Sequence, residues 1–218
     1  MKKTLIIAFS LLILLSTIST QQNIKISKFD INKIEIENNI LTKKKDIKKS
    51  LSIFYGKNIF FLKSNEIGNI LMNNSFIESF EIKKKYPDTL KISIFEKKPI
   101  AVLFNKKERY YLSDKIDLIE YKEMKNFRNL PIVVGNKKQF KIFYDDLKKI
   151  QFPFSEIKKF TLYESNRWDL ETTDEKEIKL PSKNYLKKLE NYLDLINKNN
   201  FKKYKVFDYR IENQLILK

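Results

Sequence analysis

The chain of 218 residues contains no cysteine and no histidine. These absences exclude disulfides, thiol nucleophiles, histidine general bases and Cys/His zinc sites. Only three glycines are present, and none belongs to a glycine-rich phosphate loop. Acidic neighbours such as Asp145-Asp146 and Asp174-Glu175 diverge on a helix or a strand, so they do not form a catalytic carboxylate pair. The sequence therefore predicts a protein that is not an enzyme, with no cofactor, no metal site and no small-molecule substrate.

Arginine is also scarce in this strongly basic chain. The net charge is +17, with 44 Lys and Arg against 27 Asp and Glu, yet arginine occurs only at positions 109, 128, 167 and 210. Proteins that read nucleic acids rely on arginine forks and aromatic platforms, and no such cluster is visible. The abundance of Lys, Ile and Asn is typical of AT-rich codons and solvated lysine faces. We therefore expect no nucleic-acid partner.

The N-terminal segment is apolar. Lys2-Lys3 precede an uncharged stretch from Thr4 to Ile24, which is long enough to cross about 30 Å of hydrocarbon if its polar end enters the interface. A cleaved signal peptide would begin in the same way, but Ile18-Ser19-Thr20 is a poor cleavage site. We predict a cytoplasmic tail at residues 1–4, an uncleaved transmembrane anchor at 5–23, and the rest of the chain outside the cytoplasm.

The next segment has the order strand, helix, helix, strand, strand. Ile31–Glu37 alternates as a strand, one helix follows a Thr42 cap and stops at Gly56, and a shorter helix follows a Ser64 cap. Phe80–Phe95 alternates as a hairpin with one apolar face, and Pro87-Asp88 supplies its turn. Both helices are short, so we expect them to pack on one face of the sheet.

Two motifs at the end of this segment indicate a family. The phrase Tyr-Pro-Asp-Thr-Leu at 86–90 and the phrase Glu-Lys-Lys-Pro-Ile-Ala at 96–101 follow the predicted element order, and together they resemble the POTRA domain of the FtsQ/DivIB family of cell-division proteins. The resemblance implies a POTRA domain at residues 27–97. Glu96 itself is expected to pair with a nearby lysine, which would contribute little at an exposed position.

The remainder, residues 98–218, alternates short strands with two amphipathic helices. The helices are predicted around Phe140–Ile150 and after Ser182, and the last strands around Lys205–Arg210 and Leu215–Leu217. Three phrases resemble the second, β-rich domain of the same family: Arg-Trp-Asp-Leu at 167–170, Ile-Lys-Leu-Pro at 178–181 and Phe-Asp-Tyr-Arg at 207–210. The family's usual glycines are replaced near Asp117 and Glu175, so the tightness of those two turns is open. The fold class expected overall is α+β, with a transmembrane helix, a POTRA domain and a mixed or antiparallel sheet with flanking helices.

The resemblance also implies a function. FtsQ-type proteins are non-enzymatic, single-pass inner-membrane scaffolds at the division septum, whose periplasmic part links early and late division proteins by binding FtsB and FtsL. By motif, the expected partner-binding residues are Arg167, Tyr209, Arg210, Ile211, Gln214, Leu215 and Ile216. Two alternatives stay open. Asp208 and Arg210 share one strand face and can instead form structural salt bridges to neighbouring strands, and a POTRA-bearing chaperone or secretion accessory protein has the same first domain.

Overall fold

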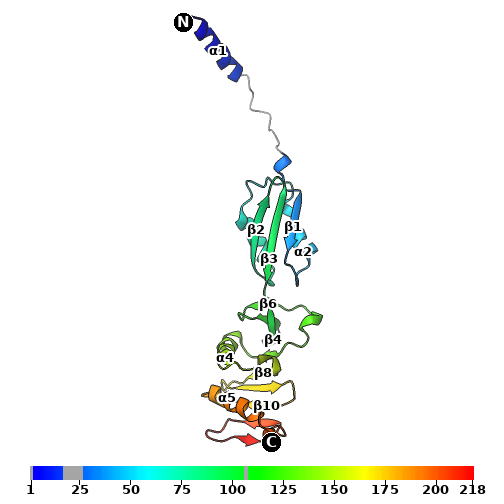
Figure 1. Cartoon of the computed structure of the whole chain (residues 1–218), viewed down its shortest axis with the longest axis vertical. Coiled ribbons are helices and arrows are strands. Elements are labelled where there is room, and N and C mark those ends of the chain that lie inside the picture. Colours follow the sequence, from blue (N-terminus) through cyan, green and yellow to red (C-terminus); the bar gives the residue numbers. More distant parts are fainter. Residues whose placement is uncertain (1, 17–26, 106–107) are drawn as a thin grey trace.

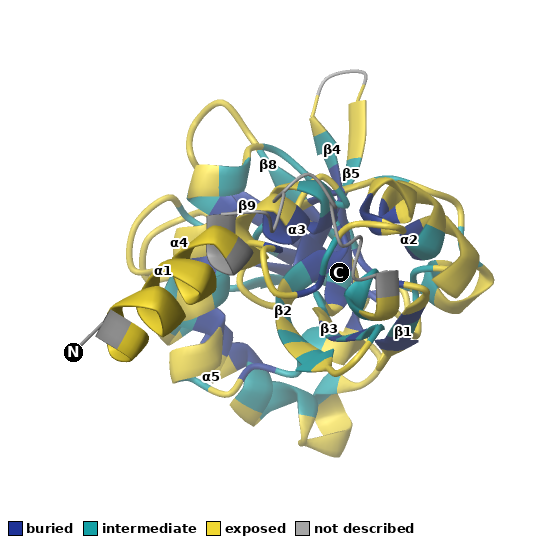
Figure 2. Cartoon of the chain, turned by 90° about the horizontal axis from the view of Figure 1, so that it is seen from above, coloured by how far each residue is buried: buried dark blue, intermediate teal, exposed yellow. Residues whose placement is uncertain are grey.

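The computed structural model describes residues 2–16, 27–105 and 108–218 (Figure 1). Helix α1 (Lys2–Ser16) is followed, after the segment 17–26, by the short 3-10 turn η1 (Ser27–Phe29). The described side chains of α1, residues 3–13, are all exposed (Figure 2). No helix within the described ranges has the length and apolarity needed to cross a membrane. The anchor predicted at 5–23 extends past Ser16 into residues outside those ranges.

The first sheet has three strands and confirms the predicted element order. Its elements are β1 (Lys33–Glu37), α2 (Lys44–Ser50), α3 (Ser64–Leu71), β2 (Ile77–Lys85) and β3 (Thr89–Glu96). Strand β3 is central, parallel to β1 and antiparallel to β2. The register opposes Phe80 to Ile94 and Ile82 to Ile92, so the alternating apolar residues share one face. That face packs with Ile47, Leu51 and Ile67 from the helical segments in one buried core.

The predicted helix caps are wrong. The N-cap positions of α2 and α3 are Lys43 and Lys63, and neither helix has a side-chain cap. The last helix, α5 (Tyr185–Ile196), begins after Ser182 as predicted, and its N-cap residue, Asn184, is in a left-handed conformation and makes no side-chain cap. The Thr42 hydroxyl instead donates to Glu96, 54 residues away. These helices are therefore held by tertiary packing rather than by their own first turns.

The second sheet has nine strands and includes the C-terminus of the chain. Its strands are β4 (Pro99–Asn105), β5 (Glu108–Ser113), β6 (Leu118–Glu120), β7 (Ile132–Val134), β8 (Ile157–Leu162), β9 (Trp168–Thr172), β10 (Glu177–Lys179), β11 (Val206–Asp208) and β12 (Ile216–Leu217). Their spatial order is β12-β11-β10-β9-β8-β7-β4-β5-β6. Three neighbouring pairs are parallel and the others antiparallel, which confirms the predicted mixed sheet. Helix α4 (Lys137–Lys149) connects β7 to β8, and α5 connects β10 to β11.

The two faces of this sheet are covered differently. On one face, α4 and α5 bury Phe143, Leu189 and the predicted core residue Trp168 in a large aromatic core. On the opposite face, Val102 and Tyr111 of β4 and β5 belong to a smaller cluster packed against residues 121–130. No described helix covers that opposite face over β8 to β12. Alternation along each strand therefore places polar side chains there.

Glu96 lies at the end of the first sheet, and the prediction that it pairs with a lysine is wrong. Its carboxylate accepts hydrogen bonds from the backbone N–H groups of Ile40, Leu41 and Thr42 at 2.9, 2.6 and 2.7 Å. Glu96 is the last residue of β3, and Pro99 begins β4. The carboxylate therefore satisfies three backbone donors of the loop before α2 at the point where the chain leaves the first sheet.

Further contacts reinforce this junction. Glu78 of β2 forms an ion pair with Lys115, and the Ser75 hydroxyl accepts the backbone N–H of Glu120 at 3.0 Å. Phe76 packs against Tyr111 with ring centroids 6.4 Å apart. Residues before Glu96 thus contact the β5–β6 hairpin directly, so the two sheets are in contact beyond their covalent connection.

Both turns that lack the family's glycine are nevertheless tight. Ile116 and Glu175 adopt φ values of 62° and 64°. The turns are closed by Ser113 N–H to the Asp117 carbonyl and by Thr172 N–H to the Lys176 carbonyl, each at 2.9 Å. Each left-handed residue costs about 1–2 kcal/mol relative to glycine. The hairpins therefore keep their geometry at the expense of local strain.

We expect Glu96→Ala to lower the free energy of unfolding by about 1–2 kcal/mol. Three backbone N–H groups lose their acceptor, and only some of them can form hydrogen bonds with water instead. Urea denaturation followed by circular dichroism measures the change. Glu81→Ala, an exposed change on β2, is the matched control and should stay within about 0.5 kcal/mol of the parent. Equal midpoints for the two variants would contradict the proposed importance of this carboxylate.

Candidate partner-binding face

A row of in-register residues crosses the open face of the second sheet. The pairings place Asp169 of β9 beside Lys179 of β10, Lys179 beside Asp208 of β11, and Asp208 beside Ile216 of β12. Paired residues share a face, so the row runs from the middle of the sheet to its edge. Both aspartates are buried, each 8% exposed. The row therefore contains acidic groups that need cationic partners.

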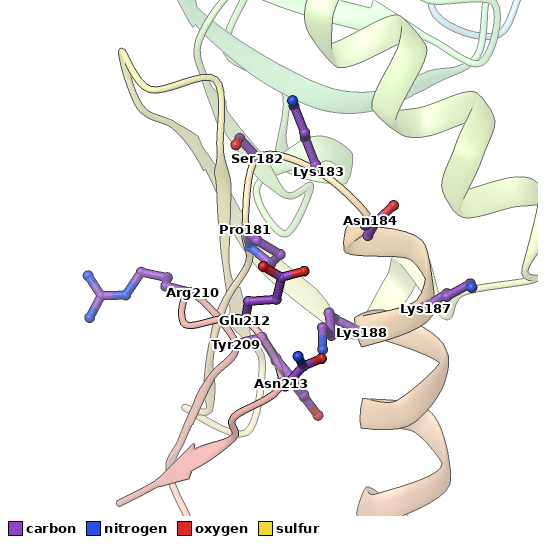
Figure 3. A pocket seen from close by; sticks show the side chains of 10 residues that line it. All are labelled: Pro181, Ser182, Lys183, Asn184, Lys187, Lys188, Tyr209, Arg210, Glu212 and Asn213. Carbon is purple, nitrogen blue, oxygen red and sulfur yellow. The ribbon is translucent and has the colours of Figure 1, made fainter.

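Arg210 supplies one of these partners. Its guanidinium donates to the Asp208 carboxylate through Nε at 2.8 Å and Nη2 at 2.6 Å, and its backbone N–H donates to Oδ1 at 3.1 Å. These hydrogen bonds from Arg210 lower the pKa of Asp208 despite its burial. The Arg210 side chain remains 46% exposed and points away from α5 (Figure 3). The salt bridge thus lies within one segment rather than between neighbouring strands as predicted, and the guanidinium still faces solvent.

Arg167 has the equivalent position beside Asp169. Its Nη1 lies 3.3 Å from Oδ1 of Asp169, and its guanidinium lies over the Tyr163 ring at 4.2 Å. Burial raises the pKa of Asp169, and the charges of Arg167, Lys179 and Arg210 oppose that effect. The two arginines that the sequence singles out therefore lie on the same sheet face and act on the same buried carboxyl group.

Strand β12 is the edge of the sheet next to this row. Val206 and Lys218 exchange two backbone hydrogen bonds, of 3.0 and 3.2 Å, so they form a hydrogen-bonded pair. In an antiparallel ladder the next residue, Leu217, then points its N–H and C=O away from β11, and Leu215 does the same. No other strand of the described chain pairs with that side. The edge therefore offers unsatisfied backbone groups to a further strand.

A hollow of about 420 Å³ lies beside this edge, between the start of α5 and the turn after β11 (Figure 3). Its lining includes Lys183, Lys187 and Lys188, with Glu212 the one carboxylate among its residues. A second hollow of about 330 Å³ shares Lys187 and Lys188 and reaches Gln214 and Leu215 of the edge. With more lysines than carboxylates in their lining, the two hollows form a basic groove that suits an acidic chain.

The predicted site residues occupy three different environments. Arg167, Arg210 and Ile216 share the open face, while Ile211 and Gln214 are exposed in the turn between β11 and β12. Leu215 packs partly against the core. Tyr209 is only 2% exposed and its hydroxyl donates to Asn191 of α5, so its ring can position the strand but presents little surface.

Sequence analysis missed other residues of this face. Asp169 and Lys179 complete the charged row, and Leu217 supplies outward backbone groups. The spacing of two residues between Arg167 and Asp169 was an available signal, but the register that places Lys179 between the two aspartates and sets the outward groups of Leu217 was not. No group of acidic residues in the described ranges could hold a metal ion.

Two stretches of the chain match known protein families. The family described as "POTRA domain, FtsQ-type" matches residues 29–97. The family described as "Cell division protein FtsQ/DivIB, C-terminal" matches residues 101–210, and this second match alone covers just over half of the chain. The chain belongs to the FtsQ/DivIB family. Membership makes it a cell-division protein, and it favours this class over the POTRA-bearing chaperones and secretion accessories considered above. The family is named for cell division and is not a known enzyme family.

Two curated relatives and one solved structure are similar to parts of this chain. The cell division protein FtsQ of Rickettsia bellii is 29% identical over 191 residues, covering 85% of this chain and 71% of its own length. The cell division protein DivIB of Clostridium botulinum is 36% identical over 131 residues, covering 58% of this chain and 48% of its own. The extracytoplasmic domain of DivIB from Geobacillus stearothermophilus, a solved structure, aligns with 47% of this chain and 92% of its own at a TM-score of 0.33 and 14% identity.

We expect Arg210→Gln to raise the pKa of Asp208, because the main cause that lowers it is removed while burial remains. A carboxyl group with a lowered pKa stabilises the fold above its unfolded value and loses that contribution as the pH falls through the folded value. The variant should therefore lose more stability at pH 7 than at pH 2. Carboxyl ¹³C NMR titration measures the pKa. Arg128→Gln, which removes an exposed pair with Glu123, should leave Asp208 unchanged.

Proposed function

We propose that this FtsQ/DivIB-family protein is a single-pass inner-membrane scaffold of the division septum that binds an FtsB/FtsL-type complex in the periplasm. Its proposed segments are a cytoplasmic tail at 1–4, an anchor at 5–23, a POTRA domain at 27–97 and a β-rich domain at 98–218. Separate hydrophobic cores in the two sheets support the last two segments. Binding through these surfaces requires no catalytic step.

The open edge of β12 is the observation that best supports the partner site. Its outward backbone groups at Leu215 and Leu217 can pair with an extended segment of the partner, as in other complexes that form by strand addition. Backbone pairing supplies affinity without dictating a sequence, so side chains beside the new strand must select the partner. Ile216 and Arg210 flank the edge on its open face.

Charge supports an acidic partner segment at this edge. The solvent-facing guanidinium of Arg210 lies on one side of β12, and the groove containing Lys187 and Lys188 lies on the other. An acidic segment would be attracted from both sides, which raises association rates and disfavours basic competitors. Because Asp208 already neutralises part of the Arg210 charge, Arg210 contributes mainly by orienting a partner carboxylate.

The N-terminal segment supports membrane attachment. Thr4 to Ile24 lack any charged residue, Lys2-Lys3 precede them, and the helical part α1 presents exposed apolar side chains such as Leu5, Phe9 and Leu12. Such a surface is costly in water and is matched by lipid. Lysines on the N-terminal side favour a cytoplasmic N-terminus.

We expect Leu217→Pro to weaken binding of the FtsB/FtsL-type complex by about tenfold, since it deletes an outward N–H and places a ring on the open edge. The hydrogen bonds between β11 and β12 involve other residues and should remain. Leu217→Val is the matched control because it trims the side chain but keeps the N–H. Affinity is measured by calorimetry with the periplasmic part of the complex, and circular dichroism checks folding. Equal affinities of the two folded variants would show that the partner does not bind at this edge.

We expect the mature protein to retain its N-terminal segment, because no good cleavage site follows Ile18. Intact-mass measurement of protein extracted from membranes decides this. A reporter joined after Lys218 should be active only in the periplasm. A mature chain that begins near Gln21, or a reporter active in the cytoplasm, would contradict the single-pass arrangement.

A further inference from the structure

Three loops meet at the end of the first sheet where the chain arrives from its N-terminal segment. Backbone hydrogen bonds join Ile59 N–H to the Phe29 carbonyl at 2.9 Å, Ile31 N–H to the Lys57 carbonyl at 2.9 Å, and Asn32 N–H to the Asp88 carbonyl at 3.0 Å. These bonds tie the loop before α3 and the β2–β3 turn to the start of β1. In Figure 1 this end is the top of the first sheet, next to η1. These hydrogen bonds therefore fix the backbone that carries the side chains at this end of the sheet.

Exposed aromatic rings gather on this end. Phe60 is 51% exposed, Phe61 83% and Tyr86 55%. The Phe60 ring stacks on Tyr86 with centroids 4.7 Å apart and meets the edge of Phe29 at 4.9 Å. We call Phe29, Phe60, Phe61 and Tyr86 the aromatic tip. No part of the described chain covers Phe61, and so large an apolar group in water marks a surface that meets another phase or molecule.

Lysines adjoin the residues of the aromatic tip along the chain. Lys28, Lys57, Lys63 and Lys85 are exposed, and of these Lys57 pairs with Glu66 at 4.0 Å and Lys85 with Glu35 at 3.0 Å. The amine of Lys84 donates to the backbone carbonyls of Phe60 and Leu62 at 3.2 and 2.9 Å, which holds a positive charge directly behind the rings. Rings flanked by lysines are the composition that suits a bilayer interface, where the rings enter the headgroup region and the amines meet anionic lipid.

The chain length places this tip near the membrane if the proposed anchor is correct. From residue 23, the end of the proposed anchor, to Ser27 there are four peptide steps, which span about 14 Å at most. The aromatic tip therefore cannot leave the neighbourhood of the bilayer surface. A membrane is thus present at high effective concentration, whereas any protein partner would have to be recruited.

We propose that the aromatic tip rests in the interfacial region of the membrane, with Phe60 and Phe61 among the headgroups and the adjoining lysines against anionic lipid. This proposal rests on the proposed anchor and goes beyond it, since an anchor alone leaves the orientation of the domains free. A second contact beside the anchor would hold the long axis of the chain away from the membrane. Strand β12, at the opposite end in Figure 1, would then face away from the bilayer.

A tryptophan reporter tests this contact in the full chain. Phe61→Trp keeps an aromatic ring at the most exposed position, and the one native tryptophan, Trp168, is buried in the second sheet and gives a constant background. The protein is reconstituted into vesicles of phosphatidylglycerol and phosphatidylcholine with brominated acyl chains. We expect the added tryptophan to lose about half of its emission or more. Ile142→Trp, 62% exposed on α4, is the matched control and should lose none.

Charge and flotation separate the possible outcomes. Lys28→Glu with Lys63→Glu should reduce the quenching of the Phe61→Trp reporter to the level seen in vesicles of phosphatidylcholine alone. Both reporters should float with the vesicles because the anchor is intact. If both float and the Phe61→Trp reporter is no more quenched than the control, the tip proposal is overturned and the anchor stands. This is the result expected if the aromatic tip binds another division protein instead of lipid. A chain that does not float overturns the anchor, and the tip proposal with it.

Discussion

Within the described part of the chain only two α-helices, α4 and α5, cover the nine-stranded sheet, and this constraint determines most of the second half of the molecule. Both α4 and α5 lie on one face, where they bury the core around Trp168 and Phe143. On the other face, residues 121–130 cover only the strands next to the first sheet. Over β8 to β12 that face is in contact with solvent, so residues along each of these strands alternate between the apolar core face and the polar open face. The charged row from Asp169 to Asp208 is the direct result.

The buried carboxylates on this solvated face of the sheet require cationic partners. Asp169 and Asp208 are largely shielded from solvent, and an unpaired carboxylate there would be unfavourable. Arg167 and Arg210 satisfy this requirement while remaining partly exposed. The same arginines thus stabilise the sheet and provide its solvent-facing positive charge. A structural ion pair and a partner contact are therefore compatible uses of Arg210 rather than competing ones.

Side-chain contacts next to Glu96 connect this sheet to the first one. An ion pair between Glu78 and Lys115, a hydrogen bond from the Glu120 N–H to Ser75, and the packing of Phe76 on Tyr111 join the two sheets in addition to the chain itself. Side-chain contacts of this kind resist bending between the two units. The aromatic tip and strand β12 consequently lie at opposite ends of one elongated body, as Figure 1 shows.

Local patterns in the sequence were sufficient for the elements and for the family. Alternation predicted the hairpin Phe80–Phe95 and its apolar face, periodic apolar residues predicted α4 and α5, and the phrases around Tyr86, Trp168 and Asp208 indicated FtsQ/DivIB. Each of these depends on residues a few positions apart, whose relation is set by the helical or extended backbone. The absence of cysteine and histidine likewise bounded the chemistry before any fold was known.

Contacts between distant segments were decided only by the tertiary structure. Thr42 looked like a helix cap, yet its hydroxyl meets Glu96, because the end of β3 lies beside the loop before α2. The outward backbone groups of Leu217 depend on β11 pairing with β10 on its other side, and the shared face of Arg167 and Arg210 depends on the register of three strands. Sequence spacing contains no information on which strand becomes an edge, because that follows from how the whole sheet buries its apolar face.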